Sequence, residues 1–334
     1  MSWRRINAFF FYIPNRVIIS LMESIKENIS LKDHTTFRIG GPARYFLETS
    51  YKDELKEAIE WAIGKKIRFL VIGGGSNILF SDKGFDGLVI AYKSSFAAKE
   101  DLIEARGDGI FKINTTITLS SLIIEMKNYS GLEWAAGIPG TLGGAINGNS
   151  GAAGESMADS VLSVDVLEIR SGAVSEKFFS SEECLFGYRT SIFKNNPELL
   201  AVSAELKLKE DSEEAVSEKI KNNLERRKAK QPKGFSAGSV FKNHHGKIED
   251  SIISSYPELE KNNEKGIIPA GLLIELCGLK GKTIGGAKIS EEHANFIINF
   301  QNASSEDVIA LIDLIKKSVK EKFSVDLEEE IKIF

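Results

Sequence analysis

The sequence contains little of what stabilises a secreted or a metal-dependent protein. Its 334 residues include only two cysteines, Cys184 and Cys277, which lie far apart, and four histidines that are scattered along the chain. These numbers and spacings argue against a disulfide scaffold and a zinc cluster, so we expect no metal site. Unpaired cysteines are typical of a reducing compartment, and we therefore predict a cytoplasmic protein.

Long hydrophobic runs and an excess of one charge are missing as well. No stretch approaches the roughly 18 apolar residues of a membrane-spanning helix. Pro14 cuts the apolar run 8–13 too short for a signal peptide. The 43 basic and 47 acidic residues give a net charge of -4, which argues against nucleic acid as the main partner. We expect small-molecule ligands, no membrane association and no obligatory protein partner.

The length predicts two or three domains, each large enough to bury its own core. Residues 1–21 are interpreted as an N-terminal extension that need not be native, since Met22 offers an alternative start. The remaining pattern predicts two α/β regions followed by a smaller α+β region, with boundaries at 22–92, 93–208 and 209–334. The predicted fold class is therefore α+β.

Periodicity predicts the main elements of these regions. Alternation of apolar and polar residues indicates strands at 44–49, 67–72, 88–91, 161–169, 174–179 and 199–208. The turn Ser171-Gly172 between two of them predicts a hairpin. Helical spacing indicates helices at 121–129, 212–229 and 270–277, and another after Ser304, which Asp307 completes as a capping box. The last ten residues, 325–334, alternate as one strand that places Glu330 on its polar face.

Two glycine tracts, 73–77 (GGGSN) and 137–145 (GIPGTLGGA), interrupt this pattern. Neither matches a dinucleotide-binding G-x-G-x-x-G or a P-loop, so both of those folds are disfavoured. Glycine N–H groups can approach phosphate oxygens closely. No Lys or Arg occurs between Asn128 and Ile169, so main-chain amides would hold any diphosphate there. Single glycine tracts more often mark tight turns, but two on two α/β regions favour a dinucleotide that bridges both.

Several motifs follow one another from about residue 28 to the end of the chain: 35–41 (TTFRIGG), 73–79 (GGGSNIL), 137–145, 186–189 (FGYR), 237–243 (AGSVFKN), 284–287 (IGGA) with His293-Ala294, and 327–330 (LEEE). In these motifs and in their order the chain resembles the MurB family of UDP-N-acetylenolpyruvoylglucosamine reductases. This resemblance implies a vanillyl-alcohol-oxidase-type FAD-binding fold with two FAD-binding domains and a substrate domain. It also implies NADPH-dependent reduction of an enolpyruvyl nucleotide-sugar through bound FAD, in peptidoglycan precursor synthesis.

The resemblance implies which residues meet FAD. They belong to the two glycine tracts and to two nearby turns: Arg38, Gly40, Gly73, Gly74, Gly75, Ser76, Asn77, Gly137, Ile138, Pro139, Gly140, Thr141, Gly143, Gly144, Asn149 and Gly151.

Three residues are candidates for the chemistry, because reduction of an enolpyruvyl ether needs charge stabilisation and a proton donor besides the hydride. Arg189 can grip a carboxylate through two hydrogen bonds. Ser239, beside the flexible Gly238, is the candidate proton donor. Glu330 matches the second glutamate of the family's Leu-Glu-x-Glu pattern. Without the resemblance, a surface salt bridge, a turn serine and a solvated carboxylate are the simpler interpretations.

A nucleotide-sugar substrate carries several negative charges, and residues 219–242 hold eight basic residues and one acidic residue. The predicted substrate-binding residues are Tyr188, Lys230, Lys242, Asn243, Lys280 and His293. Only 50 positions separate Arg189 from Ser239, so the chain resembles the shorter type of the family, which lacks an extra loop with an aromatic clamp. Which group replaces that clamp stays open.

Two other functions remain open from the sequence. An FAD oxidase of small alcohols or hydroxy acids would use the same fold, although Ser239 and Glu330 argue against it. A sensor of nucleotide-sugars that does no chemistry is disfavoured by the candidates at all three chemical positions.

Overall fold

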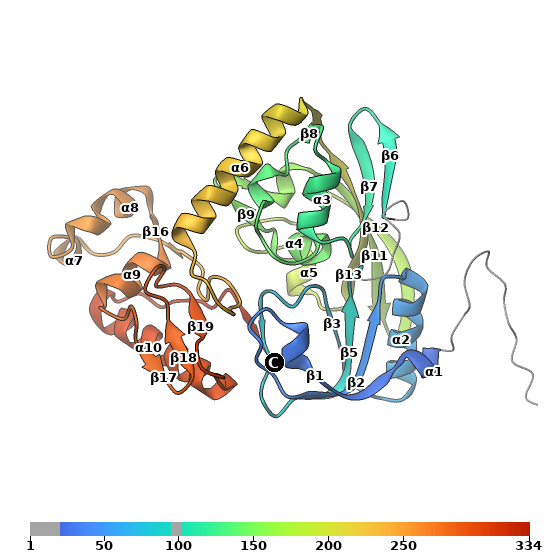
Figure 1. Cartoon of the computed structure of the whole chain (residues 1–334), viewed down its shortest axis with the longest axis horizontal. Helices are drawn as coiled ribbons and strands as arrows, with labels where there is room; N and C mark the ends of the chain where they lie inside the picture. Colours follow the sequence, from blue (N-terminus) through green and yellow to red (C-terminus); the bar gives the residue numbers. More distant parts are fainter. Residues whose placement is uncertain (1–20, 95–101) are drawn as a thin grey trace, which may run out of the picture.

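The computed structural model describes residues 21–94 and 102–334. The predicted N-terminal extension therefore lies outside the described residues, apart from Leu21, where the short helix α1 (Leu21–Ser24) begins. Three regions follow one another along the chain and appear in Figure 1 as the blue, green and orange to red parts.

The first region is a mixed four-stranded sheet with a helix packed on it (Figure 1). The strand order is β1 (Lys26–Ser30), β2 (Pro42–Thr49), β5 (Phe85–Tyr92), β3 (Phe69–Ile72), with β1 antiparallel to β2 and the other pairs parallel. Helix α2 (Lys52–Gly64) buries the apolar residues whose spacing predicted it, among them Leu55 and Ile59. This face also packs against Leu167 and Val202, so the first and second regions share a core.

The second region is built on a five-stranded antiparallel sheet. Its order is β12 (Ala173–Ser180), β11 (Val161–Arg170), β13 (Leu199–Lys207), β7 (Ile110–Asn114), β6 (Ile103–Gly107). The predicted hairpin is confirmed, since Arg170 pairs with Ala173 and both turn residues, Ser171 and Gly172, have positive φ. Three short helices cover this sheet: α3 (Leu119–Glu125), α4 (Leu142–Gly148) and α5 (Ile192–Asn195).

The third region packs helices on a small antiparallel sheet. Its main elements are α9 (Ala270–Leu276), α10 (Ser305–Phe323), β17 (Thr283–Ile284), β18 (Ala287–Ile289) and β19 (Ile297–Asn299), with α7 (Asp250–Ile253), α8 (Glu260–Lys265), β15 (His244–His245) and β16 (Ile267–Ile268) beside them. The predicted capping box of α10 is present between Ser304 and Asp307. Phe37 and Ile39 of the first region join the core of the third.

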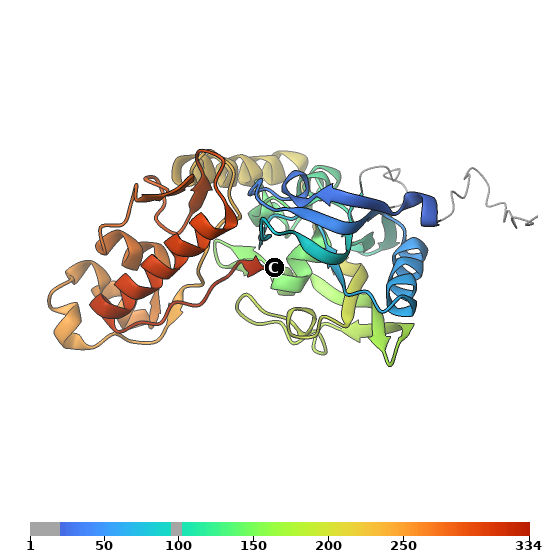
Figure 2. The same ribbon diagram turned by 90° about the horizontal axis from the view of Figure 1, so that it is seen from below.

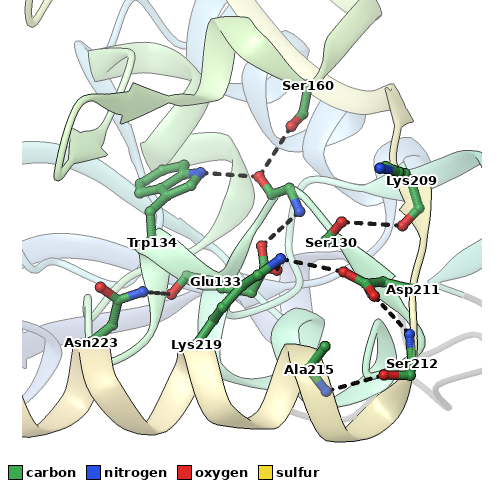
Figure 3. Close-up of polar contacts among 11 residues, drawn as sticks. Ser130, Glu133, Trp134, Ser160, Lys209, Asp211, Ser212, Ala215, Lys219 and Asn223 are labelled. Atoms are coloured by element: carbon green, nitrogen blue, oxygen red, sulfur yellow. Dashed lines mark hydrogen bonds and ion pairs between the residues drawn. The ribbon is translucent and has the colours of Figure 1, made fainter.

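Helix α6 (Glu213–Lys230) lies along the second region, although the predicted boundary at residue 209 assigns it to the third (Figure 1). Polar contacts hold it there, as Figure 3 shows: Lys219 Nζ lies 3.1 Å from Glu133 Oε1, and Asn223 Nδ2 donates to the Glu133 carbonyl oxygen at 2.9 Å. The buried Glu133 carboxylate also accepts the Gly131 N–H at 2.6 Å. The position of that domain boundary stays a prediction.

The C-terminal segment corrects one expectation. Instead of a ten-residue strand, only β20 (Lys332–Ile333) is extended, and it pairs in parallel with β4 (Ile78–Leu79) of the first region. Figure 2 shows the red chain crossing from the third region to the first. The alternation places Val325, Leu327, Ile331 and Ile333 on one apolar face. The first three are buried, but Ile333 is 42% exposed. The segment changes partner at this point because Glu330 pairs with Val240, whereas Lys332 pairs with Ile78.

Four two-residue strands complete the described structure: β8 (Tyr129–Ser130) with β14 (Lys209–Glu210), and β9 (Gly151–Ala152) with β10 (Glu155–Ser156). Within residues 21–94 and 102–334, no helix combines the length and the hydrophobicity that crossing a bilayer requires.

Candidate functional site

A cavity of about 770 Å3 lies where the three regions meet. Most of the residues predicted to meet FAD line it: Gly73, Gly74, Gly75, Ser76, Asn77, Gly137, Ile138, Pro139, Gly140, Thr141, Gly143, Gly144 and Gly151. The structure therefore brings the two glycine tracts together around one space. Their assignment to the cofactor stays a prediction.

The first glycine tract follows β3 and turns back sharply before β4. Gly75 has a φ of +63°, and a Cβ there would lie 2.0 Å from the carbonyl oxygen of His34. The Gly75 carbonyl in turn accepts the Thr36 N–H at 3.1 Å. This turn needs glycine both for its conformation and for its space.

The second tract approaches the first so closely that their main chains touch. A Cβ on Gly74 would lie 2.9 Å from the Gly140 Cα, and Ser76 Oγ donates to the Pro139 carbonyl at 3.1 Å. Thr141 then caps α4 by accepting the Gly144 N–H at 3.3 Å. Helix α4 was not expected from the sequence, because its Gly- and Ala-rich residues have no amphipathic pattern. Thr141, a residue type that favours the N-cap position, was the one local feature that could have indicated the start of a helix.

The main chain of these turns fits the anionic part of a dinucleotide. The backbone N–H groups of Gly74, Gly75 and Ser76 make no hydrogen bond to any described residue. Unpaired amides at the wall of a cavity provide an anion site without a formal charge. A side chain at Gly74 would fill the space between the two loops, because its Cβ would lie 2.9 Å from the Gly140 Cα. The loops are therefore able to hold the pyrophosphate of FAD.

Three residues predicted to meet FAD do not line this cavity. Arg38 lies 3.3 Å from Asp33, and a Cβ on Gly40 would be 2.8 Å from the Phe80 Cβ. Asn149 ends α4 in a left-handed conformation, with φ of 42°, and its Nδ2 donates to the Gly187 carbonyl at 3.0 Å. These contacts explain the three residue types by local structure, and their role toward FAD stays a prediction.

A second cavity, of about 410 Å3, adjoins the third region. Tyr188, Asn243 and His293, which were predicted to bind substrate, line it. Arg189, Ser239 and Glu330 line both this cavity and the larger one. The three residues predicted to do the chemistry, which are up to 141 positions apart, therefore meet where the two cavities adjoin.

Arg189 is held in a tight turn. Gly187 and Thr190 exchange two backbone hydrogen bonds, of 3.0 and 3.2 Å, and Arg189 between them has a φ of +54°. Glycine or asparagine usually takes this position of a turn, because other residues are strained there by about 1 kcal/mol or more. Lys194 Nζ donates to the Arg189 carbonyl at 2.9 Å and helps to hold the turn.

Glu330 and Arg189 form a half-buried ion pair. Arg189 Nε lies 2.7 Å from Glu330 Oε1, and Nη2 of the same guanidinium donates to the Gly151 carbonyl at 3.0 Å. Burial raises the pKa of Glu330, and the charges of Arg189, Lys194 and Lys242 oppose this rise without cancelling it. The Glu330 carboxyl thus accepts a proton at a higher pH than an exposed glutamate does.

Backbone pairing places Ser239 beside this ion pair. The Glu330 N–H donates to the Val240 carbonyl at 2.7 Å, and the Lys242 N–H donates to the Glu328 carbonyl at 2.9 Å. Ser239 Oγ makes no hydrogen bond to any of the described residues. Its hydroxyl is consequently available to a ligand in either cavity.

Three predicted substrate lysines lie outside both linings. Lys242 forms an ion pair with Glu328 and Lys280 one of 2.7 Å with Glu275, while Lys230 is exposed at the end of α6. Each stays a prediction. His293 does line the smaller cavity; its Nδ1 accepts the Asn295 N–H at 3.2 Å, and burial lowers its pKa, so the ring is neutral near pH 7.

Three cations that the prediction did not include line the larger cavity: Lys194, Arg227 and Lys332. Burial lowers the pKa of each side chain. Two of these residues could have been found from the sequence. Lys332 lies two positions after Glu330, on the same face of the predicted strand, and Arg227 belongs to the basic stretch 219–242. Nothing in the local sequence distinguishes Lys194.

Two family models match the chain. One, described as the C-terminal domain of UDP-N-acetylenolpyruvoylglucosamine reductase, covers residues 230–334, and the other, described as an FAD binding domain, covers residues 43–176. The FAD model includes both glycine tracts, and the C-terminal model includes Ser239 and Glu330. The predicted vanillyl-alcohol-oxidase type of FAD-binding fold is thereby confirmed.

Whole-chain relatives agree with the two models. UDP-N-acetylenolpyruvoylglucosamine reductases of Chlamydia muridarum and Caldanaerobacter subterraneus are each 38% identical to this chain, over 93% and 95% of it and over 94% and 97% of their own lengths. The crystal structure of UDP-N-acetylenolpyruvylglucosamine reductase (MurB) from Thermus caldophilus matches 92% of this chain and 98% of its own, with 32% identity and a TM-score of 0.71. This chain therefore belongs to the MurB family of UDP-N-acetylenolpyruvoylglucosamine reductases.

Proposed function

We propose that this chain reduces UDP-N-acetylglucosamine enolpyruvate to UDP-N-acetylmuramate, with FAD as bound cofactor and NADPH as reductant, in peptidoglycan precursor synthesis. Family membership and the FAD-binding model support the activity. The observation that carries it is the position of Arg189, Ser239 and Glu330, which line both the glycine-walled cavity and the smaller one. A cofactor in the first cavity and a substrate in the second would meet at these side chains.

Bound FAD supplies the hydride that the substrate alkene takes up. The protein must orient the substrate and stabilise the negative charge that develops on its carboxylate side. We assign this role to Arg189. Its Nε and one N–H of Nη2 are engaged by Glu330 and Gly151, whereas Nη1 has no bond to a described residue and remains available for a carboxylate.

Ser239 is the proposed proton donor. A serine hydroxyl gives up a proton only where the alkoxide is stabilised, which nearby positive charge does. Arg189, Lys194 and Lys332 line the cavity that Ser239 also lines. Glu330, whose pKa is raised by burial, is the nearby group proposed to help polarise the substrate carboxylate or to pass a proton.

The smaller cavity is the proposed place of the nucleotide-sugar, with Tyr188, Asn243 and His293 on its wall. We propose that NADPH uses the same opening first and leaves as NADP+ before the substrate enters. The protein is expected to act in the cytoplasm, a prediction supported by the free Cys184 and Cys277. Nucleic acid, membrane and an obligatory protein partner are not part of the proposal.

The activity is tested by anaerobic mixing of the purified, FAD-loaded protein with its two substrates in turn. We expect NADPH to bleach the flavin absorbance and UDP-N-acetylglucosamine enolpyruvate to restore it. Protein that takes up no FAD, or reduced protein that the enolpyruvyl compound does not reoxidise, would contradict the proposal. Reduction of the flavin by a small alcohol without NADPH would indicate an oxidase instead.

Ser239→Ala separates the two half-reactions. We expect flavin reduction by NADPH to survive within about threefold, while reoxidation by the substrate slows by about 10^3-fold, in the range for losing a general acid. Stopped-flow absorbance measures both. Equal losses in the two half-reactions would show that Ser239 has a structural role and not a chemical one.

A further inference from the structure

Arg227 places a positive charge at the larger cavity without a carboxylate partner. Its side chain is half-buried and lines that cavity. Among the described residues, no acidic group forms an ion pair with its guanidinium, and Nη2 donates only to the Trp134 carbonyl, at 3.4 Å. By contrast, Arg189 in the same cavity is paired with Glu330 at 2.7 Å.

The position of Arg227 is set by one face of α6. Lys219, Asn223 and Arg227 are four residues apart, so they lie on the same side of the helix. Each one donates to residue 133 or 134 of the second region (Figure 3 shows the first two). The helix is therefore fixed in rotation as well as in place, and Arg227 is the member of the stripe that reaches the cavity.

The second glycine tract makes room for this side chain. Gly137 has a φ of +76°, and a Cβ there would lie 3.1 Å from the Arg227 Cδ and 3.9 Å from its Nε. The guanidinium stem thus packs directly on the first residue of the GIPG turn. The second glycine tract lacks Lys and Arg, so it was predicted to hold the cofactor through backbone amides alone. In the structure, Arg227 places a positive charge beside it.

Arg227 shares its cavity with the residues proposed to do the chemistry. Arg227 and Arg189 line the same cavity, and burial is the main cause that lowers the pKa of Arg227. Arg189 lines the boundary with the smaller cavity. The unpaired amides of Gly74, Gly75 and Ser76 already offer a site for phosphate. Because these amides can hold the phosphates, the charge of Arg227 is left for a different negative charge on the cofactor.

We propose that Arg227 stabilises the negative charge that the FAD ring gains on reduction, and so raises the reduction potential of the bound cofactor. This inference rests on the proposed function. NADPH transfers a hydride, which is two electrons and one proton, to the neutral oxidised ring; NADP+ leaves, and the ring keeps one negative charge. A guanidinium near the ring lowers the free energy of that charged form and leaves the neutral form almost unaffected.

The test compares Arg227→Gln with Lys228→Gln, which removes the same unit charge from the next, exposed position of α6. The reduction potential of the FAD-loaded proteins is measured anaerobically against an indicator dye, and the FAD dissociation constant by fluorescence titration of the apoproteins. For R227Q we expect the equilibrium constant of reduction to fall about tenfold, or ~30 mV for a two-electron couple. For K228Q, and for Arg227→Lys, which keeps the charge, we expect changes below about threefold.

A potential for R227Q equal to that of K228Q would overturn the inference, as would an equal fall in R227K and R227Q. A folded R227Q protein that fails to retain FAD, or binds it more weakly at an unchanged potential, would assign Arg227 to the cofactor phosphates instead. Should R227Q not fold, Arg227→Met keeps an unbranched stem against Gly137 and takes its place. Failure of the wild-type protein to bind FAD would contradict the proposed function itself, a different result from any of these.

Discussion

Two parts of the lining of the larger cavity are built from different materials. In one part, main chain from Gly73–Asn77 and Gly137–Thr141 forms the wall, and the residues of each tract are neighbours in the sequence. The charged part of the lining consists of side chains from three distant segments, those of Arg189, Arg227 and Glu330, of which Arg227 packs against Gly137. The difference teaches that the anion site depends on the absence of side chains in a short stretch, whereas the charged part depends on long-range packing.

The largest effect on this comparison is expected from Gly75→Ala. A Cβ at Gly75 would lie 2.0 Å from the His34 carbonyl oxygen, so the first loop must move. We expect the FAD dissociation constant to rise at least about tenfold and the free energy of unfolding to fall by about 3 kcal/mol. Fluorescence titration and denaturant unfolding measure the two quantities.

Gly266→Ala is the matched control for that variant. Gly266 has nearly the same φ, +65° against +63°, but no atom lies within 4 Å of a Cβ placed there. It should lose only about 1 kcal/mol and keep its affinity for FAD. Equal losses of stability and of FAD affinity in the two alanine variants would mean that the positive φ alone makes glycine necessary at residue 75. The close approach to the His34 carbonyl oxygen would then be unimportant.

A smaller effect is expected where α6 joins the charged part. Lys219→Gln leaves the Glu133 carboxylate, whose side chain is 7% exposed, without its cation. Because Lys219 itself is 51% exposed, we expect a loss of about 1 kcal/mol in the free energy of unfolding. Lys127→Gln removes an ion pair to Glu213 of the same helix in which both side chains are more than half exposed. Lys127→Gln should lower the free energy of unfolding by less than about 0.5 kcal/mol. A larger loss in K127Q than in K219Q would show that burial of the carboxylate does not decide the effect.

The smallest effect is the pH dependence contributed by Glu330. Its pKa in the folded protein is raised above 4.5, chiefly by burial, so the folded state binds the proton more tightly than the unfolded chain does. The stabilisation is complete below about pH 4.5 and is lost as the pH rises through the folded pKa. The Tm of the apoprotein minus that of Glu330→Gln should therefore fall by about 1–2 °C on going from pH 4.5 to 7.

Glu328→Gln, two residues earlier and 72% exposed, is the control for this pH series. Its profile should run parallel to that of the wild-type protein. Scanning calorimetry at several pH values measures the differences. A Tm difference between the wild type and E330Q that grows with pH would contradict the direction assigned to Glu330.

The same contrast explains what could be predicted from the sequence. Turns that need glycine, the hairpin at Ser171-Gly172 and the cap of α10 at Ser304 are local, and each was predicted where the structure has it. The glycine tracts were predicted to share one ligand because their composition alone shows the missing side chains. The resemblance to MurB, which the whole-chain relatives confirm, supplied the three chemical residues that now line both cavities.

What could not be predicted depends on contacts between distant residues. The place of α6 on the second region follows from the buried Glu133, which nothing near residue 219 indicates. The course of residues 325–334 follows from pairing first with Val240 and then with Ile78. Lys194 differs from these, because its partner Arg189 is only five positions away; its place in the cavity depends on the Arg189 turn, which the local sequence does not indicate.

The pairing of β20 with β4 has a practical consequence for handling and folding the protein. Phe334 is hydrogen-bonded to both Leu79 and Ser81, so a purification tag fused directly behind it would disturb β20, which begins two residues after Glu330. The partners of this strand lie some 250 positions apart, and closing so long a loop is slow. Among the described strands β4 pairs with β20 alone, so during synthesis β4 stays unpaired until the last residues of the chain have been made.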